Sequence, residues 1–148
     1  MGRVWSEENK FQRWLDVELA ATETLAEAGT VPREAARKLR ERARIDVARI
    51  NEIEAKVRHD VIAFTIAVQE TVGDPEAARW LHYGLTSNDV VDTAQALLIR
   101  DASKLIEEAI ARFAEILEKR AWEFKDTPEI GRTHGIHAEP ITFDKSSR

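Results

Sequence analysis

The sequence predicts an all-α fold, with an N-terminal helical domain at residues 1–88 and the start of a helical bundle at residues 89–148. Apolar residues recur at helical spacing through most of the chain. Side chains that cap helices stand directly before several of these apolar runs. In addition, neither glycine nor proline occurs between Gly84 and Pro128, so one helix can extend through most of that region.

Composition places the chain among globular proteins, because 43% of its 148 residues are hydrophobic and 33% are charged. The formal net charge of -5 argues against a surface that binds nucleic acid. The absence of cysteine excludes disulfides and thiolate metal sites, and it is consistent with a reducing compartment. The chain has neither an apolar signal segment nor a run of about 18 apolar residues that would span a membrane. We therefore expect a cytoplasmic protein without membrane partners.

The first three helices follow from capping residues and helical spacing. Ser6 is the predicted cap of the first helix, which Gly29 can end. Pro32 suits the first turn of a second helix that runs to about residue 42, and its many charged residues predict a solvated surface helix. Asp46 is the predicted cap of the third helix, which carries apolar residues on one side.

A short polar stretch, R-H-D at Arg58–Asp60, precedes the apolar run V-I-A-F-T-I-A-V. Asp60 is the predicted cap of a fourth, largely buried helix. Arg58 and His59 would then lie at the N-terminal end of that helix, where free backbone N–H groups favour an anion. The alternative is a capping aspartate flanked by solvated side chains.

A second polar stretch, H-Y-G-L-T-S-N-D at His82–Asp89, precedes a predicted helix from about residue 90 to 124. At 1.5 Å per residue this helix would be ~50 Å long. A helix of that length cannot bury its apolar stripe in so small a domain, which predicts a bundle shared between subunits. At its start, the hydroxyls of Thr86 and Ser87 would join free backbone N–H groups and the positive helix end, which are the parts of a carboxylate site. The alternative is an ordinary N-cap.

The third polar stretch is G-R-T-H-G-I-H-A-E-P-I-T-F, Gly131–Phe143. Its glycines permit turns, and Pro140 discourages helix at the residue before it. We expect a loop that holds His134 between Thr133 and Gly135, with an exposed imidazole and a backbone that can approach a ligand. The alternative is a loop that joins helices and carries solvated histidines.

Together and in this order, the segments R-H-D-V-I-A-F, H-Y-G-L-T-S-N-D-V-V-D-T-A and G-R-T-H-G-I-H-A-E-P resemble the adenylosuccinate lyase family of the fumarase/aspartase superfamily. The resemblance extends to about Phe143, and it implies that the long helix is the first of the superfamily's central bundle. It implies an elimination in purine biosynthesis that splits succinyl-AMP to AMP and fumarate and cleaves a succinylated imidazole-carboxamide ribotide. It implies neither cofactor nor metal. The alternatives are a related lyase, such as argininosuccinate lyase, or a non-catalytic helical module.

The resemblance also implies a general acid and seven residues that bind substrate. The acid is His134, a role that suits imidazole at neutral pH, whereas the motif gives His137 no clear role. The residues that bind substrate are Arg58, His59 and Asp60 at the nucleotide, His82 towards the phosphate, Thr86 and Ser87 at the succinyl carboxylate, and Thr133.

Parts of the family pattern are missing from the sequence. In full-length members an Arg-Tyr pair precedes a methionine that matches Met1, and a later glycine-serine loop with the signature M-P-x-K-x-N supplies the catalytic base. After Phe143 the tail D-K-S-S-R is unlike the family. We therefore expect a fragment that is inactive alone. Because the family assembles each active site from three subunits of a homotetramer, we also expect a homo-oligomer.

Overall fold

The computed structural model describes residues 1–143, and the D-K-S-S-R tail lies outside the described residues. Its elements are, in order, α1 (Glu7–Glu27), α2 (Arg33–Arg42), α3 (Val47–Val57), α4 (Asp60–Val72), α5 (Pro75–Ala78), α6 (Ser87–Glu123), β1 (Pro128–Thr133) and β2 (Ile136–Thr142). The described chain forms two compact units, which divide after Ala102, and α6 begins in the first and ends in the second. The predicted helical fold class is confirmed.

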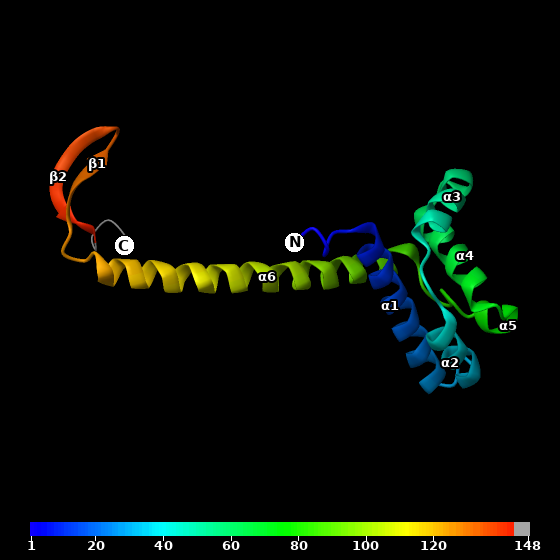
Figure 1. Ribbon diagram of the computed structural model, residues 1–148. Helices are drawn as coiled ribbons and strands as arrows, with labels where there is room; N and C mark the ends of the chain where they lie inside the picture. The colour runs from blue at the N-terminus through cyan, green and yellow to red at the C-terminus, as the bar shows by residue number, and fades with distance from the viewer. Residues whose placement is uncertain (144–148) are drawn as a thin grey trace. The chain divides into compact units, whose positions relative to one another are not determined.

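The first unit is a small helical assembly with an aromatic centre. In it α1 packs against α2, α3 against α4, and α5 against both α2 and α4 (Figure 1). The rings of Phe11, Trp14 and Phe64 are at most 3% exposed, and their centroids lie 5.3, 5.4 and 6.1 Å apart. Edge-on and offset contacts of this kind stabilise beyond the area they bury. These rings therefore fix α1 on α4.

Two of the predicted helix starts are confirmed by their capping bonds. The Ser6 side chain accepts a hydrogen bond from the Asn9 N–H, and the Asp46 side chain accepts one from the Arg49 N–H. The first helix ends at Glu27, where Gly29 takes a left-handed φ of 79°. These starts and stops are local, which is why capping chemistry predicts them.

The predicted cap of α4 is wrong by one residue. His59, not Asp60, is the N-cap, and its Nδ1 accepts from the Ile62 N–H at 3.4 Å. Asp60 is the first residue of α4, and its Oδ1 accepts from the Val61 N–H at 2.7 Å. The cause lies at Arg58, which ends α3 in a left-handed conformation with φ 56°. The chain then leaves only His59 in the extended conformation that an N-cap needs.

Helix α6 begins at Ser87, about three residues before the predicted start, and ends at Glu123. In the first unit it buries Val90, Ala94, Leu98 and Ala102, which follow one another at four-residue spacing. Beyond them every residue from 104 to 120 is exposed. The apolar stripe predicted on this helix is therefore covered only at its N-terminal end by the described residues.

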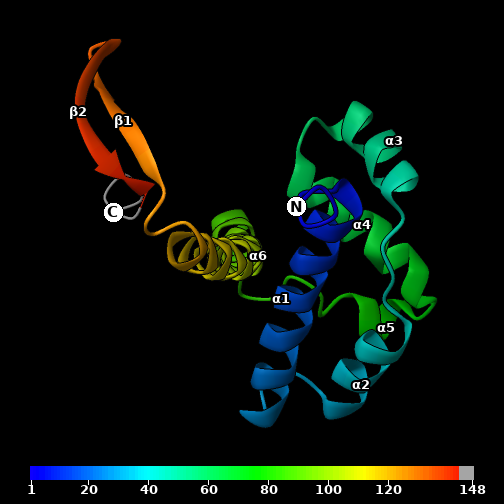
Figure 2. The same cartoon turned by 60° about the vertical axis from the view of Figure 1, so that its left-hand side comes forward.

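The third polar stretch forms a β-hairpin, so the expected loop is wrong in form. Strands β1 and β2 pair antiparallel, with Thr133 opposite Ile136 (Figure 2). His134 and Gly135 are the two turn residues, with φ of 52° and 75°. Positive φ at both positions is the type I′ turn that matches the twist of paired strands. Asparagine or aspartate before glycine would have predicted this turn from the sequence, whereas histidine before glycine does not.

Candidate functional site

A buried carboxylate holds His82, and sequence reasoning did not identify it. Glu18 lies on α1 and is 0% exposed. Its Oε2 accepts from the main-chain N–H of His82 at 2.8 Å, and its Oε1 lies 2.6 Å from His82 Nδ1. His82 takes a left-handed φ of 65°, which is strained for a residue other than glycine. One carboxylate thus holds both the backbone and the ring of this residue.

Burial and the contact with His82 have opposite effects on the pKa of Glu18. Burial raises the pKa of the Glu18 carboxyl, and the hydrogen bonds and charge of His82 lower it in part. A buried carboxylate is costly unless it is hydrogen-bonded and paired. The His82 side chain is 26% exposed, so part of its ring reaches the surface. His82 therefore connects a buried charge to solvent.

At the start of α6, the Asp89 carboxylate of the same helix occupies the hydrogen-bond donors of Thr86. Asp89 Oδ2 accepts from the main-chain N–H of Thr86 at 2.8 Å and from its hydroxyl at 3.1 Å. The bond from the Thr86 N–H to Asp89 is one half of a capping box, and this N–H in particular holds the pKa of Asp89 below its ordinary value. A substrate carboxylate at Thr86 would have to displace Asp89. The hydroxyl of Ser87, which is half-buried, has no side-chain hydrogen bond within residues 1–143.

The residues between α3 and α4 are exposed. His59 Nδ1 must keep its lone pair to cap α4, and it lies 3.5 Å from Asp60 Oδ1. The Arg58 guanidinium has no hydrogen bond or ion pair to any described residue. Of the three residues predicted to contact a nucleotide, only Arg58 thus has a charged group that is free.

His134 occupies the first position of the hairpin turn, and Thr133 is the last residue of β1. Both side chains are exposed, as is that of His137, which lies opposite Arg132 in the hairpin. Neither His134 nor His137 hydrogen-bonds to a described residue through its ring. The hairpin therefore presents the predicted acid at its tip.

The predicted residues fall into separate groups. Six of them belong to the first unit, whereas Thr133 and His134 belong to the second. Within the first unit, no hydrogen bond or ion pair joins the group Arg58–Asp60 to the group His82–Ser87. His82 and Asp89 do interact, because His82 contributes to the lowered pKa of Asp89.

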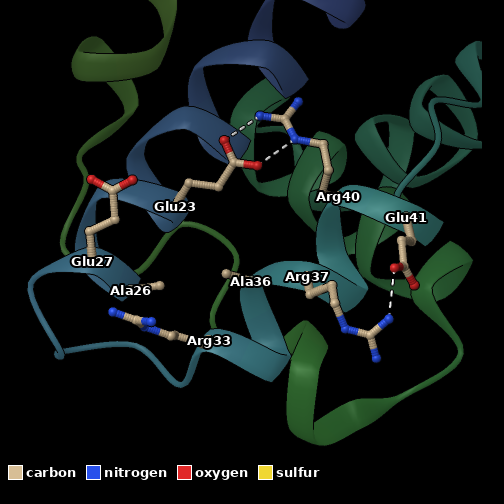
Figure 3. A pocket seen from close by; sticks show the side chains of 8 residues that line it. All are labelled: Glu23, Ala26, Glu27, Arg33, Ala36, Arg37, Arg40 and Glu41. Atoms are coloured by element: carbon tan, nitrogen blue, oxygen red, sulfur yellow. Dashed lines mark hydrogen bonds and ion pairs between the residues drawn. The ribbon is translucent and has the colours of Figure 1, made fainter.

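A hollow between α1 and α2 is lined by charged residues but contains none of the predicted site residues (Figure 3). Arg40 donates two hydrogen bonds of 2.6 Å to Glu23, and Arg37 pairs with Glu34 at 2.7 Å and with Glu41 at 2.8 Å. Glu27 and Arg33 also line the hollow, and neither has a hydrogen bond or ion pair from its side chain to a described residue.

Residues 1–143 contain neither a metal-binding cluster nor a helix that could span a membrane. No group of three or more histidine, cysteine, aspartate or glutamate side chains is placed to hold a metal ion. None of the described helices combines the length and the apolar character needed to cross a bilayer.

Comparison with known proteins gives matches along almost the whole chain. The family described as lyase matches residues 1–147. The chain is 50% identical to an adenylosuccinate lyase of Bacillus subtilis, 51% to one of Streptococcus mutans and 48% to one of Staphylococcus saprophyticus, each over 143 residues. These alignments cover 97% of this chain and 33% of each relative. The chain therefore spans about a third of the length of these relatives.

Solved structures agree in fold. A fumarate lyase from Mesorhizobium sp. BNC1 matches with a TM-score of 0.90 and 28% identity over 99% of this chain and 35% of the other. A 3-carboxy-cis,cis-muconate lactonizing enzyme from Pseudomonas putida matches with the same TM-score and 33% identity, over 99% of this chain and 34% of the other.

Proposed function

We propose that this chain, which belongs to the lyase family, carries the catalytic acid and part of the substrate-binding site of an adenylosuccinate lyase. The observation that carries this proposal is the identity of 48–51% with three adenylosuccinate lyases. The identity with the solved fumarate lyase and with the solved muconate lactonizing enzyme is lower, at 28% and 33%. The alternative is a related lyase, such as argininosuccinate lyase.

The proposed reaction is an elimination. A base removes the proton from the carbon beside a carboxylate of succinyl-AMP, the carbon–nitrogen bond breaks, and the departing nitrogen takes a proton from an acid. AMP and fumarate leave, and the succinylated ribotide would be cleaved in the same way. His134 is the proposed acid, and its exposed ring at the tip of a hairpin turn can approach a leaving group. We assign the base to no residue of this chain.

We assign the proposed substrate contacts first to polar side chains that have no partner among residues 1–143. Ser87 would bind the succinyl carboxylate, because its hydroxyl has no side-chain partner within residues 1–143 and stands at the positive end of α6. Thr86 would take part if Asp89 moves aside. Arg58 would bind the nucleotide through its free guanidinium, with His59 and Asp60 beside it, and Thr133 would contact substrate next to the acid.

Assembly with further copies is part of the proposal. The exposed section of α6 carries large apolar side chains that are 39–60% exposed. Their spacing of four and three residues is that of a helix that packs on other helices. These residues are Leu105, Ile106, Ile110, Phe113, Ile116 and Leu117. We propose that copies of the chain cover this stripe in a homo-oligomer.

A chimera tests the proposal. The matching third of the Bacillus subtilis adenylosuccinate lyase is replaced by residues 1–143 of this chain, and fumarate release from succinyl-AMP is measured. We expect turnover in the chimera and a loss of several orders of magnitude with His134→Gln, whereas His137→Gln should leave most of the activity. A folded chimera that cleaves argininosuccinate, or that acts on neither substrate, would contradict the proposal.

A further inference from the structure

Glu18 contacts His82, one of the residues predicted to bind substrate. No charged side chain in the first unit is less exposed than that of Glu18. We propose that Glu18 is a positioning residue that keeps a proton on Nδ1 of His82 and so presents Nε2 to the phosphate of the bound nucleotide. The role of the phosphate rests on the proposed function, whereas the state of the ring rests on the geometry alone.

The direction of the hydrogen bonds between Glu18 and His82 decides where the ring proton lies. Glu18 Oε2 already accepts from the His82 main-chain N–H at 2.8 Å. An ionised carboxylate can only accept, so the contact of 2.6 Å between Oε1 and Nδ1 requires a proton on Nδ1. The hydrogen bond made by one ring nitrogen decides the state of the other. Nε2 is then the nitrogen left for a ligand.

The contact between Glu18 and His82 is kept although both residues stand in unfavourable surroundings or conformations. Glu18 is fully buried on α1, where the other buried residues are apolar except for Thr22. A strained left-handed backbone at a residue other than glycine is costly and persists where the surroundings impose it. His82 has this conformation, and the Glu18 carboxylate holds it through the main-chain N–H. A partner needed only for packing would not require both contacts.

The His82 ring lies near two carboxylates. The charged groups that interact with His82 are Glu18 from α1 and Asp89 from the start of α6. To donate to a phosphate oxygen as well as to Glu18, the ring must carry a second proton, on Nε2. When Nδ1–H is bonded to Glu18, Nε2–H can donate to a phosphate oxygen, and such a charge-assisted bond is among the stronger ones.

Nitrogen-15 NMR of the ¹⁵N-labelled chain tests the ring directly. Two-bond proton–nitrogen correlations show which ring nitrogen of each histidine carries a proton. We expect a protonated, hydrogen-bonded Nδ1 at His82 and an unprotonated Nδ1 at His59, which caps α4 in the same spectrum. A His82 ring with a bare Nδ1 would overturn the proposal, because the proton would then belong to Glu18.

A variant tests the consequence. Glu18→Gln keeps the shape but leaves one acceptor oxygen for two donors, the main-chain N–H and the Nδ1–H of His82. With that oxygen on the main-chain N–H, the hydrogen-bonded Nδ1–H signal should disappear. Glu23→Gln is the matched control, since Glu23 lies on the same helix but pairs with Arg40. It should leave the His82 signals unchanged. An unchanged His82 spectrum in Glu18→Gln would overturn the proposal, and if this variant does not fold, the wild-type spectrum decides.

Titration with AMP separates this inference from the proposed function. Where the wild-type chain binds AMP, Glu18→Gln should weaken binding roughly ten- to hundredfold, as expected for a hydrogen bond to a charged group. Equal binding by both would overturn the positioning role. A wild-type chain with the expected Nδ1 proton and no affinity for AMP would count against the proposed function alone, and the assignment of the ring would stand.

Discussion

Removing His82 should expose the cost of the buried carboxylate on α1. In His82→Ala, Glu18 Oε2 keeps the main-chain N–H, but Oε1 loses its partner 2.6 Å away. Breaking a buried pair by removing one member costs about 3–5 kcal/mol. The remaining main-chain bond places the expected loss near the lower end, at about 3 kcal/mol at neutral pH. Urea unfolding followed by tryptophan fluorescence reports this change, because Trp14 lies in the core of the same unit.

The pH dependence of this loss distinguishes a buried charge from lost packing. Burial raises the pKa of Glu18 above its ordinary value of 4.5, so the folded state binds this proton more tightly than the unfolded state. The associated stability is present below pH 4.5 and is lost as the pH rises through the folded pKa. His82→Ala removes the interactions that lower the pKa of Glu18, so this pKa should rise further in the variant. The variant should therefore lose more folding stability than wild type as the pH rises. The difference from wild type should be small in acid and full at neutral pH.

A matched variant removes the cationic partner of an exposed carboxylate instead. Arg40→Ala leaves Glu23 unpaired, but the Glu23 side chain is 43% exposed. Its expected cost is below about 1 kcal/mol. The reasoning would be refuted if His82→Ala cost no more than Arg40→Ala at neutral pH, or if its cost were the same at pH 4 as at pH 7.

Three further predictions follow from the same contacts. In the chimera, Ser87→Ala should weaken binding of fumarate roughly tenfold and of AMP much less, and equal effects would remove Ser87 from the carboxylate site. Ile110→Lys should reduce self-association in sedimentation velocity, whereas Glu108→Lys at a nearby charged position should not, and a wild-type monomer would contradict the proposed role of the stripe. The purified 148-residue chain should release no fumarate from succinyl-AMP, since no base has been assigned in it, and measurable release would show that such a base exists.

Sequence reasoning found the helices because their signals are local. The caps at Ser6 and Asp46 and the stop near Gly29 depend on residues within one turn, and the long helix follows from the absence of breakers. The cap of α4 was assigned to Asp60 because aspartate is the commoner capping residue. The left-handed conformation of Arg58, which moved the cap to His59, leaves no mark in the sequence.

The closed start of α6 was partly visible in the sequence. Thr86 followed by Asp89 has the spacing of a capping box, in which a side chain three residues on reaches back to the cap. The four polar residues in a row are consistent with an ordinary N-cap and with a carboxylate site, and the carboxylate site stays a prediction. The hairpin was missed because a histidine before glycine is not the usual type I′ pair, although β-branched residues flank it.

The sequence by itself determined the helical fold, the order of the three polar stretches and, through them, the resemblance to the lyase family that the comparisons confirm. These features depend on neighbours along the chain. Only the tertiary structure decided the partner of His82, because Glu18 lies 64 positions away and is one acidic residue among many in an amphipathic helix. Its burial depends on how α1 packs, and that packing turns an ordinary glutamate into the group that fixes His82.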